Sequence, residues 1–442
     1  MREVTLDPLL CQQVRRARDA RFDGKIFIAV TSTGIYCRPV CPAPSPKEAN
    51  VVYYGSAYAA EAAGFRPCLR CRPETAPGTT PWLGTSQTVA RGLRLIEGGA
   101  LDTGSVEDLA DRLGVTGRHL CRLFVEHLGA PPVRIAQTLR MQFAKRLIDE
   151  TTMPLTDIAY AAGFGSVRRF HAVVQALYGR APSALRKVHR PSSAFRLAVR
   201  EPFDWASLLG FLRARAIPGL EEVDETMYRR WWAGAEVTIH FRAPQLLVSI
   251  EGANPGQWLD ILRRVRRLFD VAADLDVINA TLSLDPLLRP LVLARPGLRV
   301  PGAWDAFEIG VRAILGQQVT VAGARTLAGR LVASFGQMPT AEQLVEADLS
   351  TIGLPGSRQE TLRAYARAVL VENETLENVR GIGPWTRDYY AMRALGEPDA
   401  FPGGDLVLRK ATGLTEKQLL VRAEAWRPWR AYAALHIWRG QS

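Results

Sequence analysis

Long hydrophobic runs are missing from this 442-residue chain, and none of its apolar stretches is long enough to span a bilayer. The first residues, MREVTLDPLL, show no apolar core behind their charges, so we expect no signal peptide. Histidine is scarce, and its six copies form no cluster with the spacing of metal ligands. These absences predict a cytoplasmic protein without a membrane partner, in a compartment where thiols stay reduced.

Positive charge, by contrast, is abundant. The chain has 56 Lys and Arg against 44 Asp and Glu, which gives a net charge of +12. Such an excess favours a polyanionic partner, nucleic acid first, although charge alone leaves an unrelated basic protein open. Charged residues at 23% and hydrophobic residues at 47% are typical of a folded protein. The length indicates roughly two to four domains.

Two segments of linker composition divide the chain into three expected regions. Residues 77–84 (PGTTPWLG) and 188–194 (VHRPSSA) are rich in Pro, Gly, Ser and Thr. Residues 1–76 contain strand-like runs at Ile26–Thr31 and Asn50–Tyr54, and residues 85–187 have helical patterns throughout. Residues 195–442 begin with alternating apolar segments in 195–300 and continue with helical patterns in 301–442.

Four of the six cysteines form two close pairs, Cys37 with Cys41 and Cys68 with Cys71. In a reducing compartment this spacing indicates metal binding, because two such pairs can supply a tetrahedral zinc site. Spacing alone also fits a zinc ribbon that only stabilises a small domain. For Cys11 and Cys121, outside the cluster, we expect free thiols.

The residues around these cysteines are distinctive. FDGKIFIAVTSTGIYCRPVCPA (Phe22–Ala43) and GFRPCLRCRP (Gly64–Pro73) resemble the N-terminal domain of the Ada family. The resemblance implies that Cys37 accepts a methyl group from a methyl phosphotriester in DNA, while the other three cysteines remain zinc ligands. Four thiolates on one Zn²⁺ carry two net negative charges, and methylation removes one of them. The repulsion from DNA phosphates then falls, so we expect DNA affinity to rise.

Two helix-turn-helix units follow one another in residues 85–187. In the first, Ser105 with Asp108 forms a helix N-cap pattern before VEDLADRLGV, and Thr116 and Gly129 bound the next helix. A long helix is expected at about Val133–Glu150. In the second unit, PLTDIAYAAGFGSVRRFHAVVQALYG, Gly163 is expected at the turn and Ser166 is expected to cap the second helix.

The second unit carries the pattern DIAxxxGFxSxxxF, which resembles the AraC family DNA-binding domain. The resemblance covers residues 85–187 and implies that each unit places one helix in the major groove. The basic residues expected on these helices are Arg118, His119, Arg122, Arg168 and Arg169. For each of them, a contact to phosphate or to solvent alone remains the alternative to base reading.

The string VRGIGPWTRDYYAMRALG (Val379–Gly396) contains a Gly-x-Gly turn between two helical patterns. Backbone N–H groups of such a turn, at Gly381 and Gly383, can approach a phosphate. The longer string resembles the helix-hairpin-helix of the AlkA family (3-methyladenine DNA glycosylase II), as do WDAFEIGVRAILGQQV and WRPWRAYAALHIW. This resemblance covers most of residues 195–440, and it implies that Asp405 is the catalytic carboxylate for hydrolysis of the N-glycosidic bond.

The resemblance also implies a pocket for a base extruded from the duplex. Trp385, Tyr389 and Trp438 match its aromatic positions, with core packing as the alternative, and electron-rich rings attract a cationic alkylated base. Gln318 stands where family members insert a Leu into the DNA gap. Trp385 occupies the position of the nucleophilic Lys of related enzymes, so we expect no Schiff base and no strand cleavage.

Together these patterns predict a multidomain α+β protein. It comprises a small zinc-bound α/β domain, an all-α double helix-turn-helix domain, and a helix-hairpin-helix glycosylase with an N-terminal antiparallel α+β subdomain. We expect one Zn²⁺, alkylated and promoter double-stranded DNA and RNA polymerase as partners, a monomeric state and association with the nucleoid. The Pro-Cys-His-Arg motif of typical Ada proteins is missing, so we expect no O6-methylguanine repair.

Two alternatives to this bifunctional repair protein and activator stay open at this point. The first is a transcription regulator whose glycosylase region is inactive. The second is a constitutive DNA glycosylase whose zinc site is purely structural. A glycosylase assay separates the first from the main interpretation, and a search for methylated Cys37 separates the second.

Overall fold

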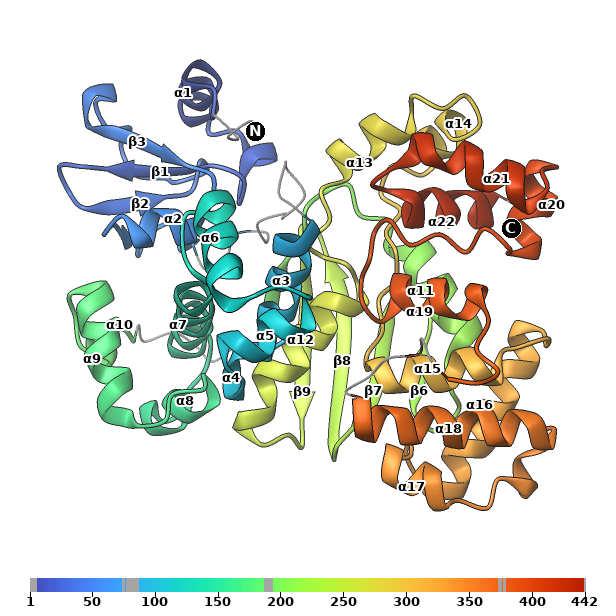
Figure 1. Ribbon diagram of the computed structural model, residues 1–442. Coiled ribbons are helices and arrows are strands. Elements are labelled where there is room, and N and C mark those ends of the chain that lie inside the picture. The colour runs from blue at the N-terminus through green and yellow to red at the C-terminus, as the bar shows by residue number, and fades with distance from the viewer. Residues whose placement is uncertain are drawn as a thin grey trace. The chain divides into compact units, whose positions relative to one another are not determined.

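The computed structural model describes residues 6–73, 76, 87–186, 194–372, 376 and 379–440 (Figure 1). Both expected linkers lie outside the described residues, except for Ala194 at the end of the second. The chain divides into two compact units, residues 1–198 with 253–263 and residues 199–252 with 264–442. In the described ranges, no helix has the length and apolar character that a membrane crossing needs.

The first unit begins with a four-stranded sheet in the order β3-β1-β2-β4. The strands are β1 (Phe27–Val30), β2 (Ile35–Cys37), β3 (Val51–Tyr54) and β4 (Arg66–Pro67), with helices α1 (Pro8–Ala17) and α2 (Ala57–Ala62) and 3-10 turns η1 (Ala20–Phe22) and η2 (Glu48–Asn50). β1 pairs antiparallel with β2 and β3, and β4 pairs parallel with β2. Phe27, Tyr36 and Ala60 are buried in its core. The runs predicted as β1 and β3 are therefore confirmed, while β2 and β4 were not expected.

The rest of the first unit is mostly helical. Its helices are α3 (Gln87–Glu97), α4 (Ala100–Thr103), α5 (Val106–Arg112), α6 (Gly117–Leu128), α7 (Pro132–Glu150), α8 (Leu155–Ala161), α9 (Val167–Tyr178) and α10 (Pro182–Leu185), followed by strand β5 (Phe195–Ala198). Ser105 and Asp108 form the predicted capping box, Thr116 caps α6, and Gly129 ends it with a left-handed backbone. The pairs α5–α6 and α8–α9 are thus two helix-turn-helix units, joined by the long helix α7 (Figure 1).

The second unit opens with helix α11 (Trp205–Arg215) and an antiparallel ladder in the order β9-β8-β7-β6. The strands are β6 (Glu221–Val223), β7 (Met227–Trp232), β8 (Ala235–Arg242) and β9 (Gln245–Glu251). Alternate residues of β8, such as Val237 and Ile239, are buried, as their alternating sequence predicts. The 3-10 turn η4 (Pro255–Gln257) and helix α12 (Trp258–Leu268) follow in the chain.

Helices make up the remainder of the chain. They are α13 (Leu275–Leu282), α14 (Arg289–Ala294), α15 (Ala306–Leu315), α16 (Val321–Phe335), α17 (Ala341–Glu346), α18 (Gly356–Glu372), α19 (Pro384–Arg393), α20 (Leu406–Thr412), α21 (Glu416–Ala423) and α22 (Arg430–Gly440), with 3-10 turns η5 (Ser350–Ile352) and η6 (Glu424–Trp426). The main apolar core lies among α15, α16 and α18, around Ile314, Leu331 and Tyr365. The secondary structure of the described residues is a mixture of helices and strands in which helices are the majority, and this confirms the predicted fold class.

A buried ion cluster joins the ladder of the second unit to its helices. Arg230 on β7 pairs with Glu221 on β6 at 3.1 Å and with Glu308 on α15. Arg312, one turn along α15, pairs with Glu221 at 2.5 Å and with Glu308 at 2.6 Å. Burial alone would raise the pKa of Glu221, but the guanidinium groups of Arg312 and Arg230 outweigh it and lower that pKa to about 2. All four groups therefore stay charged and paired.

Glu308→Gln will destabilise the second unit, because it leaves two buried guanidinium groups with one carboxylate. Breaking a buried pair of this kind costs about 3–5 kcal/mol of unfolding free energy. Urea denaturation followed by circular dichroism measures the change. Glu222→Gln is the matched control, since Glu222 pairs with Arg229 at 3.3 Å on the surface, where a pair contributes little. Equal urea midpoints for the two variants would contradict the assigned role of the buried cluster.

Candidate functional sites

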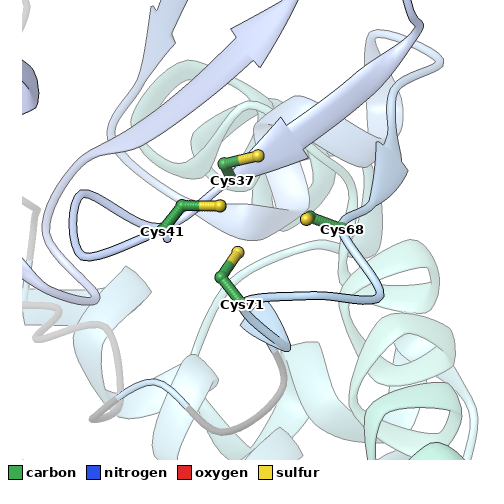
Figure 2. Close-up of side chains that lie close together, drawn as sticks. All are labelled: Cys37, Cys41, Cys68 and Cys71. Carbon is green, nitrogen blue, oxygen red and sulfur yellow. The ribbon is translucent and has the colours of Figure 1, made fainter. Parts of the chain in front are cut away.

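The four paired cysteines converge on one point of the first unit. Their sulfur atoms all lie within 4.8 Å of one another, and the side chains point inward from separate segments (Figure 2). Cys37 ends β2, Cys41 lies in the following loop, and Cys68 and Cys71 follow β4. The parallel pairing of β2 with β4 brings the two sequence pairs together, because Tyr36 lies opposite Pro67. Cys41, Cys68 and Cys71 are at most 9% exposed, and Cys37 is the most exposed of the four.

This donor set fits a zinc ion. A tetrahedral centre with Zn–S bonds of about 2.3 Å separates its sulfurs by about 3.8 Å, and the four sulfurs here all lie within 4.8 Å of one another. Hydrogen bonds that the Cys37 thiol donates to the neighbouring sulfurs, Cys41 first, raise the pKa of Cys37, and accepting such a bond from Cys37 helps lower the pKa of Cys41 to about 7. Thiols this close cannot all ionise beside one another without a cation. The cluster is therefore a zinc site with four cysteine ligands.

Backbone and side-chain groups hold the ligand loops in place. The Arg38 N–H donates to Cys71 Sγ at 3.3 Å, and the Cys68 N–H donates to the Tyr36 carbonyl at 3.0 Å. The Arg38 side chain forms an ion pair with buried Asp23 and donates to the Cys71 carbonyl at 3.1 Å. Arg38, which follows Cys37, thus joins the segment of the first cysteine pair to Cys71 of the second pair and to Asp23, which precedes β1.

Arg38→Met will weaken zinc binding by roughly 10-fold, because residues that orient metal ligands typically contribute at least that much affinity. Competition with a chelator of known affinity, monitored on the full chain, measures the loss. Arg21→Met serves as control, since Arg21 is paired with Asp19 on the surface of the same domain, with its side chain 78% exposed. If both variants hold zinc as the wild type does, Arg38 has no such role.

A hydrogen-bonded link runs from the cysteine cluster to helix α7. The Tyr36 hydroxyl donates to Glu61 Oε1 at 2.7 Å, and Thr138 on α7 donates to Glu61 Oε2 at 2.6 Å. Tyr36 immediately precedes Cys37, so the strand that ends in Cys37 is tied to the helix between the two helix-turn-helix units. Sequence reasoning did not find this link, because nothing in the spacing of these three residues marks it.

A second link joins the other cysteine pair to the same helix. Arg72 follows Cys71 directly, with a left-handed backbone (φ 53°). Its guanidinium pairs with Asp149 at 3.0 Å and with Glu150 at 3.2 Å, both at the C-terminal end of α7. Both ligand-bearing segments are therefore anchored on the helix that joins the two helix-turn-helix units.

The predicted DNA-contacting residues lie on the second helix of each unit. Arg118, His119 and Arg122 lie on α6, with both arginines exposed and Arg122 Nη2 3.0 Å from His119 Nδ1. Arg168 and Arg169 are exposed near the start of α9. Surface-exposed basic groups on these two helices are available to a polyanion, as the resemblance to the AraC family DNA-binding domain implies.

Arg169 also faces the zinc-binding domain. It lines a cavity of about 410 Å³ together with Arg66 of β4, Arg140 of α7 and apolar side chains that include Phe65 and Phe164. Arg169 therefore lies between the two domains of the first unit, so its assignment to base reading is less direct than that of Arg168.

The glycine turn of the second unit has the backbone expected of a hairpin. Gly381 has a φ of 89°, and a Cβ there would lie 2.3 Å from Thr361 Oγ1, so only glycine fits. Gly383 is the N-cap of α19, with Pro384 at its first position. Gln317 donates to the Gly381 carbonyl at 3.0 Å and so ties the turn to the α15–α16 loop. Gln318, next in that loop, is exposed with a left-handed backbone (φ 56°).

Asp405 is the N-cap of α20, and three N–H groups donate to its carboxylate. Leu408 N and Trp438 Nε1 donate to Oδ1 at 2.9 and 3.0 Å, and Trp385 Nε1 donates to Oδ2 at 2.8 Å. The side chains of Asp405, Trp385 and Trp438 are all partly accessible. The structure thus brings the predicted carboxylate and two predicted aromatic residues together from α19, α20 and α22.

Tyr389, the third predicted aromatic residue, stacks on Trp385. Their ring centroids are 5.1 Å apart and their planes differ by 9°. Buried Arg393 donates to the Tyr389 hydroxyl at 2.5 Å. Burial alone would raise the pKa of Tyr389, but the positive charge of Arg393 brings it below its usual range. Sequence reasoning missed Arg393, which holds the Tyr389 ring in place.

Comparisons with known proteins agree with this arrangement. Four family models match the chain: the metal binding domain of Ada over residues 10–74, a helix-turn-helix domain over 109–188, the AlkA N-terminal domain over 194–305, and the HhH-GPD superfamily base excision DNA repair protein over 311–429. The resemblances found in the sequence are thereby confirmed.

Individual relatives match either nearly the whole chain or one part of it. The chain is 39% identical to the "Probable bifunctional transcriptional activator/DNA repair enzyme AlkA" of Mycobacterium tuberculosis (strain H37Rv), over 97% of this chain and 95% of that protein. It is 36% identical to "DNA-3-methyladenine glycosylase 2" of Escherichia coli K12, over 55% of this chain and 96% of that enzyme. It is 40% identical to "Bifunctional transcriptional activator/DNA repair enzyme Ada" of the same strain, over 30% of this chain and 35% of that protein.

Proposed function

Since this chain belongs to the family of the probable bifunctional transcriptional activator/DNA repair enzyme AlkA, we propose that it senses methylated DNA with Cys37 and excises methylated bases with Asp405. The observation that carries the sensing half is the convergence of four cysteine sulfurs within 4.8 Å, with Cys37 the most exposed. The excision half rests on an accessible carboxylate held beside a glycine hairpin of the base excision repair superfamily.

Methyl transfer is a single displacement at carbon. Bound zinc keeps the four thiols deprotonated at neutral pH, which makes them nucleophilic. Cys37 Sγ forms a bond to the methyl carbon, the bond from that carbon to the phosphotriester oxygen breaks, and its electron pair stays on the phosphate as an ordinary diester charge. The product is a thioether, so each chain transfers one methyl group only.

Three of the four sulfurs are poorly placed for this attack. Backbone N–H groups donate to them, from Ala43 to Cys41, from Cys71 to Cys68 and from Arg38 to Cys71. A thiolate that accepts such bonds is less nucleophilic, and these three side chains are also buried. Accessibility and hydrogen bonding therefore both favour Cys37 as the acceptor, with Cys41, Cys68 and Cys71 as ligands that persist.

Methylation changes the affinity for DNA by removing a negative charge. The cluster then repels nearby phosphates less, and the helix-turn-helix units, with Arg118, Arg122 and Arg168 on their recognition helices, bind promoter DNA more tightly. The two links from the cysteine cluster to α7 keep the zinc-binding domain attached to those units. Activation of alkylation-response genes follows, with RNA polymerase recruited by a monomer bound at the promoter.

Excision uses a different chemistry in the second unit. The bond between C1′ and the nitrogen of a cationic alkylated base, such as 3-methyladenine, breaks, and its electron pair leaves with the base. Ionised Asp405 stabilises the positive charge that develops on the sugar, and a water molecule bonds to C1′ and releases a proton. Gly381 and Gly383 bind the DNA backbone, while Gln318 fills the space that the extruded base leaves.

The experiment that tests the proposal treats the full chain with duplex DNA methylated at phosphates and bases. Peptide mass spectrometry then locates methyl groups on the protein, and chromatography identifies the bases released. A methyl on Cys37 together with released 3-methyladenine supports both halves. Base release with an unmodified Cys37 would reduce the zinc site to a structural role, and a methylated Cys37 without base release would leave a regulator with an inactive glycosylase region.

A further inference from the structure

The carboxylate of Asp405 is unusually well supplied with N–H donors. Oδ1 accepts from Trp438 Nε1 at 3.0 Å and from Leu408 N at 2.9 Å, and Oδ2 accepts from Trp385 Nε1 at 2.8 Å. A carboxylate oxygen has two lone pairs in its plane. Oδ1 therefore has both positions filled by these bonds, while Oδ2 retains one position that can accept from a water molecule or face a developing positive charge.

The tryptophan rings take part in these bonds through their edges. Trp385 also has one face covered by Tyr389, at a centroid distance of 5.1 Å and nearly parallel planes. That spacing is already a direct ring-to-ring stack, so no base fits between the two rings. Trp385 therefore cannot hold the extruded base between its own ring and that of Tyr389, and such a role does not account for its place beside Asp405.

We propose that the indole N–H groups of Trp385 and Trp438 position the Asp405 carboxylate for N-glycosidic hydrolysis and leave Oδ2 as the oxygen that faces the reacting sugar. This inference rests on the proposed excision function, in which Asp405 is the catalytic residue. Trp385 and Trp438 are positioning residues that act through it. Because Trp438 comes from α22 and Trp385 from α19, the carboxylate on α20 is fixed from both sides.

The test separates the N–H group of Trp438 from its ring. Trp438→Phe removes the donor and shrinks the ring, whereas replacement of Trp438 by 3-benzothienyl-alanine keeps the bicyclic ring and removes only the N–H. Loss of one hydrogen bond to a charged group corresponds to a rate loss of roughly 10-fold or more. We expect both variants of the full chain to excise 3-methyladenine about 10-fold more slowly at saturating duplex, with KM within about 2-fold of wild type.

Trp426→Phe is the matched control. Trp426 is buried and donates the same kind of indole bond, but to Asp285 Oδ2, at 2.7 Å, and not to Asp405. We expect it to lower thermal stability and to leave the excision rate of the folded protein unchanged. A merely structural role for Trp438 would instead make its variants behave like Trp426→Phe.

The outcomes distinguish this inference from the function on which it rests. If the benzothienyl variant excises bases at the wild-type rate, or if both variants change KM alone, Trp438 acts by stacking and the positioning role is wrong, while the proposed excision stands. If the wild-type chain excises no alkylated base, the proposed function itself fails.

Discussion

Cys37→Ala will take up no methyl group from DNA that carries methyl phosphotriesters, whereas the wild-type chain will take up one per molecule. The expected effect is all-or-none, because the other three sulfurs are buried and accept backbone hydrogen bonds. Intact-protein mass spectrometry after exposure to methylated duplex measures the transfer directly. Three thiolates remain in the variant, enough to hold zinc with a water molecule as fourth ligand.

Cys121→Ala is the control for this prediction. Cys121 lies on α6 with intermediate exposure, outside the cluster, and no role in transfer is assigned to it. We expect this variant to be methylated like the wild type, and its peptide map to show the methyl on Cys37. Methylation of Cys37→Ala at another cysteine would show that the acceptor was wrongly identified, even if the zinc site is intact.

Asp405→Asn will lower the rate of base excision by roughly 10³-fold, because a neutral amide cannot stabilise the positive charge that develops on the sugar. The substitution is nearly isosteric, and the amide oxygen can still accept from Leu408 N and so cap α20. Single-turnover excision of 3-methyladenine from duplex DNA measures the loss. DNA binding, measured by fluorescence anisotropy, is expected to stay within about 3-fold of wild type, since the change lies in the transition state and not in binding.

Asp388→Asn tests whether any carboxylate near the hairpin matters equally. Asp388 lies on α19, between Trp385 and Tyr389 in the sequence, and burial raises its pKa to about 6. We expect excision by this variant to remain close to the wild-type rate. A loss of activity equal to that of Asp405→Asn would move the catalytic role away from Asp405.

The features that the sequence predicted depend on local rules. Caps such as Ser105 and Thr116 fix helix ends through bonds to residues three positions away, so they can be recognised from neighbouring letters. The zinc site was predictable because paired cysteine spacing is rare by chance, and the four sulfurs do converge. The alternating segments of β8 and β9 were likewise recognisable, since one face of each strand is buried.

Features that depend on distant contacts could not be predicted. β2 is only three residues long, and it is a strand because β1 and β4 flank it. The pairing of Arg72 with Asp149 and the buried cluster around Arg230 join residues about 80 positions apart, with no periodicity to reveal them. Charged residues in such places look like surface residues in the sequence.

The candidate excision site shows the same division. The resemblance to the AlkA family marked Asp405 as the catalytic carboxylate and Trp385 and Trp438 as pocket residues that stack on a base, with core packing as the alternative for the rings. Their hydrogen bonds to Asp405 depend on how α19, α20 and α22 pack, which no local pattern encodes. The roles of these residues therefore needed the three-dimensional arrangement, although their identities did not.

The most direct test of a protein that both senses and repairs alkylated DNA follows two products from one sample. A limiting amount of the zinc-loaded chain is incubated with an excess of methylated duplex, and both methylated Cys37 and free alkylated bases are quantified over time. We expect thioether formation to stop at one per chain, while base release continues through many turnovers. A Cys37 that remains unmodified, or base release that stops at or below one per chain, would contradict this expectation.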